Sequence, residues 1–303
     1  MKTNRHPTGA AKKAKTPPAP ATHPRRSMIA DSPLARAFWE RLPLPDCPVI
    51  DMHGHMGDWP AIYFPRPTPE QMLHSMDHAG VRLLCFSAHE ALFNADTGNQ
   101  VTIDAVRRFP DRFRGYLAIN GNYMDLVKRD LAKFDSLRDV FVGLKFLAAY
   151  HGVSLTDPRY DRAWDFAEER RLLVLCHTWG HGDLNNYPQV RAVAEKHPQV
   201  RLLMGHSCYG EWQQAARLAT EFPNVYCELT AVFECRGVLE LFVERGASKR
   251  MLFGTDLPWF SPTHGIGCVL SAEISDEDRH NILHRNAEEL LRPFIGVLRA
   301  DRI

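Results

Sequence analysis

The sequence predicts an α/β fold, a (β/α)8 barrel, and three observations lead to this prediction. Eight short apolar runs occur between residues 49 and 254, and each is only four to eight residues long. Their starts are 25 to 33 residues apart, a natural length for one strand, one helix and their loops. Polar stretches of helical length separate them. Eight such units in about 245 residues match a TIM barrel in number and size.

The apolar runs have the properties of strands in a parallel sheet. Each is too short for a free-standing helix, and each is apolar without alternation, as expected for a strand that is buried on both faces. The eight predicted strands are Val49–Met52, Arg82–Ser87, Phe113–Ile119, Val140–Leu147, Leu172–Cys176, Val200–Met204, Val225–Leu229 and Met251–Gly254.

The stretches between the runs show the spacing of amphipathic helices. In the last of them, Ser275 can cap the helix and Asp278 stands at the reciprocal position of a capping box. An open doubly wound sheet is the competing fold, but it usually has fewer strands and a glycine-rich first turn, which this chain lacks. Predicted helices include Pro69–His78, Tyr123–Leu137, Tyr160–Glu169, Val190–His197, Glu211–Glu221 and Asp276–Leu291.

The domain organisation follows from composition. Residues 1–27 hold seven basic residues, no acid and five prolines, so we expect a disordered tail. A lead-in segment at 28–47, the barrel at 48–292 and a C-terminal extension at 293–303 complete the chain. The tail could be a nucleic-acid arm, an organelle address or an artefact of translation that normally starts at Met28. Outside it, 30 basic residues face 36 acidic ones, which argues against nucleic acid as the main partner.

The cellular context is inferred from apolar segments and cysteines. No apolar run approaches the length of a membrane helix, and no signal peptide opens the chain, so we expect neither a membrane partner nor secretion. Seven cysteines are present; Cys85, Cys176 and Cys227 fall in the apolar runs, and Cys208 follows the sixth run closely. Reduced, buried thiols of this kind favour a cytoplasmic protein.

Candidate metal ligands follow the predicted strands. His53 and His55 flank Gly54 at the end of the first strand, and residues two apart on a strand share a face. Two neutral imidazoles there can bind one ion. An isolated His-x-His motif is nevertheless common in loops. His177 and His206 end the fifth and sixth strands, where an interior hydrogen-bonded histidine is the alternative.

An acid follows the last strand as well. Asp256 comes directly after Gly254 and Thr255, and Pro258 is close behind it. Such an acid could cap the next helix, but a buried carboxylate at the mouth of a barrel needs a cation or hydrogen-bond donors to stay ionised. The joint arrangement at the carboxyl ends of the strands, where such barrels have their active sites, predicts a metal site.

These motifs resemble the amidohydrolase superfamily, and within it the amidohydrolase-related (amidohydrolase 2) branch of metal-dependent hydrolases and decarboxylases. The resemblance covers about residues 48–292, and the H-x-H and G-T-D-x-P motifs are its most specific parts. It rests on Asp51-Met52-His53-Gly54-His55, Gly143-Leu144-Lys145, His177, Gly205-His206, Gly254-Thr255-Asp256-Leu257-Pro258, Phe109-Pro110-Asp111-Arg112-Phe113 and Asn286-Ala287-Glu288-Glu289-Leu290-Leu291.

The resemblance implies a set of metal ligands. His53, His55, His177 and Asp256 would surround one divalent ion, with Asp256 and His206 as the catalytic groups. Zn²⁺ suits these ligands best, while Mn²⁺, Fe²⁺ and Co²⁺ also fit. Asp51 would orient the strand or a ligand from behind.

The role of Lys145 stays open. A lysine at this position is carboxylated in binuclear amidohydrolases, but this chain has Phe146 where many members of the branch have a histidine. Binding of an anionic substrate or a buried ion pair is the alternative. Trp59, Tyr150 and Trp179 follow strands where aromatic walls are useful for a small-molecule substrate.

The reaction expected from the sequence is hydrolysis. A metal-activated water would attack the carbonyl of an amide, ester or lactone. Non-oxidative decarboxylation of an aromatic or unsaturated carboxylic acid is the alternative, and the ligand residues do not separate the two. A non-catalytic barrel is the third possibility, and it predicts missing ligands where all positions are filled. A homodimer is possible.

Overall fold

The structure is a computed structural model that describes residues 31–179 and 182–296. Eight parallel strands form one sheet in the order of the sequence, so every strand pairs with the next one along the chain. The strands are β1 (Val49–Met56), β2 (Val81–Ala88), β3 (Phe113–Ile119), β4 (Phe141–Phe146), β5 (Leu173–His177), β6 (Arg201–Gly205), β7 (Val225–Glu228) and β8 (Met251–Leu252).

The sheet curves until its last strand meets its first. The Met52 N–H donates to the Phe253 carbonyl at 2.9 Å, and the His55 N–H donates to the Leu257 carbonyl at 2.7 Å. These bonds join the segment that follows β8 to β1. The predicted (β/α)8 barrel is therefore confirmed.

The strands lie where the apolar runs predicted them, with two differences. β1 continues through both histidines to Met56, whereas the apolar run ends at Met52. All eight residues of β1 are buried, because this end of the strand is covered by the loops at the barrel mouth. β8 has only two residues, since the chain after Leu252 turns towards β1.

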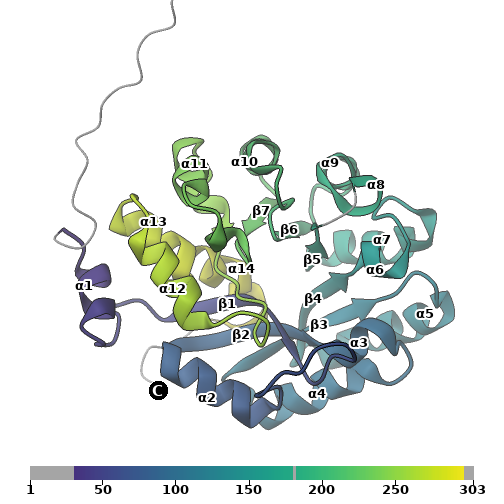
Figure 1. Cartoon of the computed structure of the whole chain (residues 1–303). Helices are drawn as coiled ribbons and strands as arrows, with labels where there is room; N and C mark the ends of the chain where they lie inside the picture. The colour runs from purple at the N-terminus through teal and green to yellow at the C-terminus, as the bar shows by residue number, and fades with distance from the viewer. Residues whose placement is uncertain (1–30, 180–181, 297–303) are drawn as a thin grey trace, which may run out of the picture.

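Helices surround the sheet, as Figure 1 shows. Ser275 and Asp278 form the predicted capping box, with the Ser275 hydroxyl accepting from the Asp278 N–H. The α-helices are α1 (Pro33–Trp39), α2 (Pro69–Ala79), α3 (His89–Phe93), α4 (Gly98–Arg108), α5 (Met124–Lys133), α6 (Ala148–His151), α7 (Asp161–Arg170), α8 (Gly182–Asn185), α9 (Tyr187–Lys196), α10 (Trp212–Glu221), α11 (Val238–Glu244), α12 (Pro262–Ser271), α13 (Asp276–His280) and α14 (Asn286–Ile295).

The last helix differs from its prediction. Instead of one α-helix over 276–291, a π-helical segment, η5, separates α13 from α14. Four short 3-10 helices also occur among the described residues. They are η1 (Phe134–Leu137), η2 (Pro158–Tyr160), η3 (Val232–Glu234) and η4 (Ser248–Arg250), and η5 covers Asn281–Arg285.

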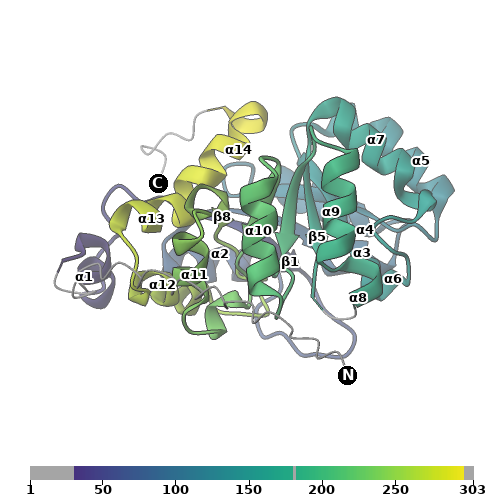
Figure 2. The same cartoon turned by 90° about the horizontal axis from the view of Figure 1, so that it is seen from above.

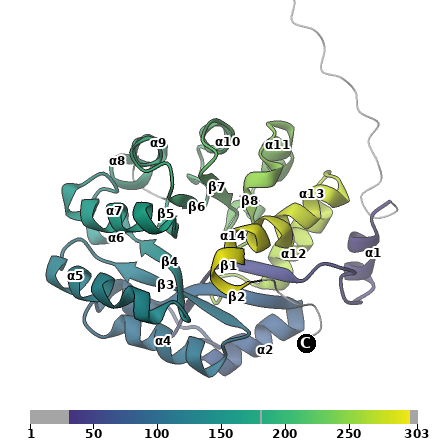
Figure 3. The ribbon, with the colours of Figure 1, turned by 180° about the vertical axis from the view of Figure 1, so that it is seen from behind.

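Two apolar cores hold the barrel together. The larger core lies between the sheet and its helices. The smaller one fills the barrel interior with alternate strand residues, and Ala287, Leu290 and Leu291 of α14 pack against it. Figure 3 shows α14 across the opening of the barrel, and Figure 2 shows α6, α8 and α12 at the other end. With one end closed by α14, the site can only open at the carboxyl ends of the strands.

Other expectations concern the ends of the chain and the cysteines. The predicted tail, 1–27, lies outside the described residues. Within the described residues, no helix is long and apolar enough to cross a membrane. Cys85, Cys176, Cys208 and Cys227 are buried as predicted, and all seven cysteines are free thiols.

Candidate active site

The two histidines of β1 point into the barrel mouth side by side. Their rings are 5.3 Å apart and nearly perpendicular, and both side chains are buried. Gly54 between them lies against Leu84 of β2, since a Cβ there would come within 2.7 Å of the Leu84 Cδ1. The glycine thus lets β1 and β2 approach closely at the level of the histidines.

Hydrogen bonds orient both imidazoles in the same way. The His53 Nδ1 lies 2.7 Å from the Glu228 Oε2, and the His55 Nδ1 lies 2.9 Å from the Ser87 carbonyl. Because both partners accept, each Nδ1 carries the proton and each Nε2 keeps its lone pair. Burial lowers the pKa of His53 well below its usual value, which keeps the ring neutral.

The Nε2 atoms of both histidines face Asp256. The Asp256 Oδ1 lies 3.3 Å from the His53 Nε2 and 3.1 Å from the His55 Nε2. This oxygen is buried, and among the described residues it has no hydrogen-bond donor. Three lone-pair atoms that face one another at these distances repel unless a cation lies among them. The residues present therefore fit a divalent ion.

The backbone at Asp256 is held in an unusual conformation. Its φ is +57°, which non-glycine residues rarely adopt, and its N–H donates to the His53 carbonyl at 2.7 Å. Strain of this kind concentrates at functional sites. The turn brings the carboxylate back over β1.

Lys145 of β4 lies against the same cluster. Its Nζ is 2.8 Å from the His53 Nε2, and the side chain is 1% exposed. Burial lowers the pKa of Lys145 to about 8. The lysine therefore donates to the lone pair that would hold a metal, and it lies in the floor of the site rather than in its open wall.

His206 and His177 form a second pair beside the first. The His206 Nδ1 lies 3.3 Å from the Thr230 carbonyl, so its Nε2 can accept from the His177 Nδ1 at 3.2 Å. His53, His206 and Asp256 each offer one atom that could bind a metal, and these three atoms lie within 4.8 Å of one another. The structure thus brings His206 as close to the cluster as the expected ligands, while His177 contacts it through His206.

Asp51 ties β1 to the turn that carries Asp256. Its Oδ1 accepts from the His53 N–H at 3.0 Å and from the Thr255 N–H at 3.1 Å, and its Oδ2 accepts from the Thr255 hydroxyl. The side chain is fully buried, and burial raises its pKa to about 8. Asp51 touches no open space, and it positions both the histidine strand and the aspartate turn.

Glu228 has a role that the sequence did not reveal. It is fully buried at the end of β7 and accepts four hydrogen bonds. The donors are the His53 Nδ1, the His206 N–H, and the N–H and hydroxyl of Thr230. Its place inside the apolar run Val225–Leu229, as the one acid of that run, was the available signal.

A Glu228→Gln variant should bind the metal 10 to 100 times more weakly, as is typical when a group that orients a ligand histidine is lost. The amide can accept at only one of its two ends, so at least one of the four donors loses its partner. Competition with a metal indicator measures the change. Glu90→Gln, on the exposed surface of α3, is the matched control. Equal affinity in both variants would contradict this role.

Aromatic rings surround the cluster. The Trp59 ring lies 5.5 Å from Trp259 and 5.9 Å from Tyr150, and Tyr150 lies 5.4 Å from His177. Trp179 lies 5.2 Å from His206. The three aromatic residues predicted to contact substrate thus all lie at the barrel mouth.

His89 is fixed within this wall. Its Nδ1 donates to the Gly57 carbonyl at 2.7 Å, and its Nε2 accepts from the Trp259 Nε1 at 2.9 Å. Its ring stacks on His55 and on Phe64. With both nitrogens in use, His89 supports the aromatic wall and offers no ligand atom.

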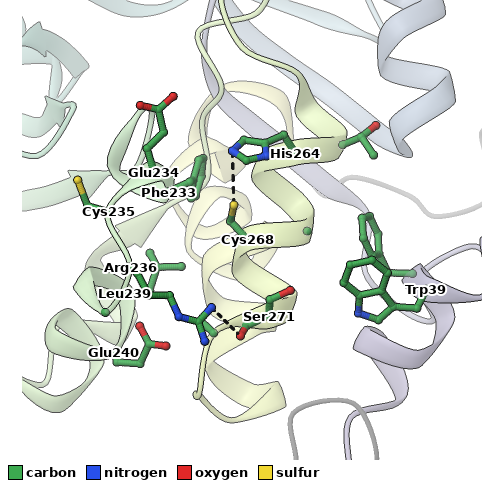
Figure 4. Close-up of a pocket in the computed structure, with 15 residues that line it drawn as sticks. Trp39, Phe233, Glu234, Cys235, Arg236, Leu239, Glu240, His264, Cys268 and Ser271 are labelled. Carbon is green, nitrogen blue, oxygen red and sulfur yellow. Dashed lines mark hydrogen bonds between the residues drawn. The ribbon is translucent and has the colours of Figure 1, made fainter.

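A separate cavity of about 500 Å³ lies on the outside of the barrel, between α1, α11 and α12. Figure 4 shows Trp39 on one side and the hydrogen-bonded pair His264 and Cys268 on another. None of the predicted site residues lines it. The metal-type cluster and this cavity are therefore distinct features.

Comparison with known proteins shows which family the barrel belongs to. The family model described as Amidohydrolase matches residues 50–292. Gamma-resorcylate decarboxylase of a Polaromonas species is 24% identical over 279 residues, covering 74% of this chain and 83% of that protein. The fold resembles 2,6-dihydroxybenzoate decarboxylase from Rhizobium, with a TM-score of 0.67, 17% identity, and 81% of this chain and 98% of that chain covered.

A third similar protein carries a metal. The structure of 5-carboxyvanillate decarboxylase from Novosphingobium aromaticivorans contains manganese and 4-hydroxy-3-methoxy-5-nitrobenzoic acid. Its TM-score is 0.66 at 13% identity, with 82% of this chain and 96% of that chain covered. The family match spans the strands that carry every residue of the cluster. The chain belongs to the amidohydrolase family, in the branch known as amidohydrolase 2.

Proposed function

We propose that this protein is a metal-dependent, non-oxidative decarboxylase of a hydroxylated aromatic carboxylic acid. One observation carries the proposal: the lone pairs of His53, His55 and Asp256 converge beside a wall of aromatic rings that includes Trp59 and Tyr150. A cation site next to such a wall suits a flat, anionic ring. The decarboxylases of dihydroxybenzoate and carboxyvanillate among the similar proteins support the same chemistry.

This proposal reverses the order of the expectations from the sequence. Hydrolysis of an amide, ester or lactone came first there, because the ligand residues suit a metal-activated water. The named relatives are decarboxylases, and they support the alternative better. The same ligands serve both reactions, so the change concerns the bond that breaks and leaves the site where it was.

The metal would be held by His53, His55 and Asp256, with His177 and His206 beside it. When bound, a divalent ion would orient the oxygen atoms of the substrate and withdraw negative charge from them. Nitrogen and carboxylate ligands suit Zn²⁺, and Mn²⁺ is equally compatible with these donors. The manganese in the carboxyvanillate enzyme supports Mn²⁺.

The protein groups would supply charge and a proton. Lys145, charged below its pKa of about 8, attracts an anionic substrate to the floor of the site. Although burial alone would raise it, neighbouring His53 and His55 hold the pKa of Asp256 well below its usual value. Asp256 would therefore take up a proton from solvent before it gives that proton to the ring carbon that bears the carboxylate. The bond to the carboxylate breaks, its electron pair stays on the ring carbon, and CO₂ leaves. Solvent then returns a proton to Asp256, while His206 hydrogen-bonds an oxygen of the substrate.

A substrate screen tests the proposal directly. The metal-loaded enzyme should release one CO₂ per molecule of a hydroxylated benzoate, and in D₂O the product ring should gain one deuterium at the carbon that lost the carboxylate. A parallel panel of esters, lactones and amides should remain intact. Hydrolysis of that panel without release of CO₂ from any benzoate would contradict the proposal.

A further inference from the structure

A second cluster of metal-type residues lies at the closed end of the barrel. Cys47, His280 and His284 each offer one atom that could bind a metal, and these three atoms lie within 4.8 Å of one another. Cys47 comes two residues before β1, His280 ends α13, and His284 belongs to η5. Because Cys47 precedes the amino end of β1, the cluster is at the opposite end from the candidate active site. None of its residues takes part in the proposed reaction.

The two histidines are already arranged as a pair. The His280 Nδ1 lies 2.9 Å from the His284 Nε2, and their rings are nearly perpendicular at 5.2 Å. The His284 Nδ1 lies 2.9 Å from the Glu288 Oε1. Since a carboxylate accepts, that Nδ1 carries the proton, and the Nε2 lone pair points towards His280. A carboxylate behind a histidine is the usual support of a metal-binding imidazole.

The local helix geometry brings these side chains together. His280, His284 and Glu288 are four residues apart and so share one face of the helix. The chain between the histidines is the π-helical segment η5. Segments of this kind occur frequently at functional sites. The wider turn therefore coincides with the pair that faces Cys47.

The cluster is largely buried and has both acidic and basic neighbours. The side chains of Cys47 and His284 are buried at 6% exposure each, and His280 is half-buried. Glu288 and Asp276 act on the Cys47 thiol through their negative charge, and Arg285 acts on it with the opposite sign. Burial, with Glu288 and Asp276, raises the pKa of Cys47 to about 12, so a bound ion would have to displace the thiol proton.

We propose that Cys47, His280 and His284 form a divalent metal site of the zinc type, separate from the active site. The Cys47 Sγ, the His280 Nδ1 and the His284 Nε2 are the ligands, and one water completes the tetrahedron from the half-buried His280 side. On binding, the thiol releases its proton to solvent and the His280 proton moves to its Nε2. One thiolate with two imidazoles favours Zn²⁺ over Mg²⁺ or Ca²⁺.

Such a site would fasten the two ends of the barrel chain to each other. It would join the segment before β1 to α13 and η5, which lead directly into α14, the helix that closes the barrel. Its role would be structural, and it does not depend on which reaction the enzyme performs.

Cobalt provides a selective probe, because the proposed active-site ligands include no cysteine. The full-length protein loaded with Co²⁺ should show the intense near-ultraviolet absorption of a thiolate bound to cobalt. Cys47→Ser should lose that band and one equivalent of metal. Cys227→Ser, another buried cysteine, should keep both, and His55→Ala should keep the band. No band in the wild type, or the same band in Cys47→Ser, would overturn the proposal.

A second variant guards against misfolding of Cys47→Ser. His280→Ala removes a half-buried ligand, and we expect its Zn²⁺ affinity at this site to fall at least tenfold while its far-ultraviolet circular dichroism stays unchanged. Zn²⁺ should raise the midpoint of thermal unfolding of the wild type, and raise it less in His280→Ala. Equal Zn²⁺ affinity and equal shifts in both proteins would contradict the site.

Discussion

Asp256→Asn should lower the rate of CO₂ release from a hydroxylated benzoate by about 10²- to 10⁴-fold, the range typical for loss of a general acid or base. The amide has the shape of the carboxyl group, but it cannot carry the proton to the ring carbon. The substitution also replaces the negatively charged carboxylate, whose Oδ1 faces the Nε2 atoms of His53 and His55, with a neutral amide. The loss therefore combines proton transfer with weaker metal binding.

Three measurements separate these two effects. The metal content of the variant reports ligand loss, and activity at saturating metal reports proton transfer. Thermal unfolding shows whether the barrel is intact. Asp125→Asn, whose side chain is 97% exposed on α5, is the matched control and should keep full activity. Near wild-type turnover by metal-saturated Asp256→Asn would show that another group carries the proton.

Gly143→Ala should destabilise the barrel by about 3 kcal/mol, at the upper end of overpacking in a close-packed core. A Cβ at this position would lie 1.9 Å from the Leu173 carbonyl oxygen of β5. That oxygen belongs to the backbone of the neighbouring strand, so β4 and β5 must separate to make room. Lys145 lies two residues further along β4, and the shift should also disturb its contact with His53.

Thermal unfolding should show this as a fall in Tm of about 5 °C, because the unfolding entropy scales at about 2.1 cal/mol/K per residue. Gly182→Ala is the control, because a Cβ there meets nothing within 4 Å and its φ is not in the left-handed region. The control should unfold within about 2 °C of the wild type. A Gly143→Ala variant as stable as the control would show that the two strands are not packed as described.

The sequence was sufficient for the barrel because its evidence is local. Apolar runs mark the buried strands, and a residue at the end of a run must lie at the barrel mouth. His53, His55, His206 and Asp256 meet there for that reason. The π-helical segment η5 left no comparable trace in the sequence.

Contacts between distant residues were the part that sequence could not supply. His53 and Glu228 are 175 positions apart, and only the closed sheet brings β1 and β7 within hydrogen-bond distance. The pairing of Cys47 with His280 likewise depends on how the last helix closes the barrel. The sequence also could not decide between hydrolysis and decarboxylation, because the same metal ligands serve both reactions. The exact ligand set and a homodimer stay predictions.

A divalent ion at the His53, His55 and Asp256 cluster should be required for loss of CO₂. The most direct test measures ¹³CO₂ from a carboxyl-labelled hydroxybenzoate before chelation, after chelation and after Mn²⁺ or Zn²⁺ is returned. Cys47→Ser is the starting protein, so that only this cluster exchanges metal. We predict activity that disappears on chelation and returns with one equivalent of metal. Undiminished ¹³CO₂ release by the metal-free protein would contradict the claim.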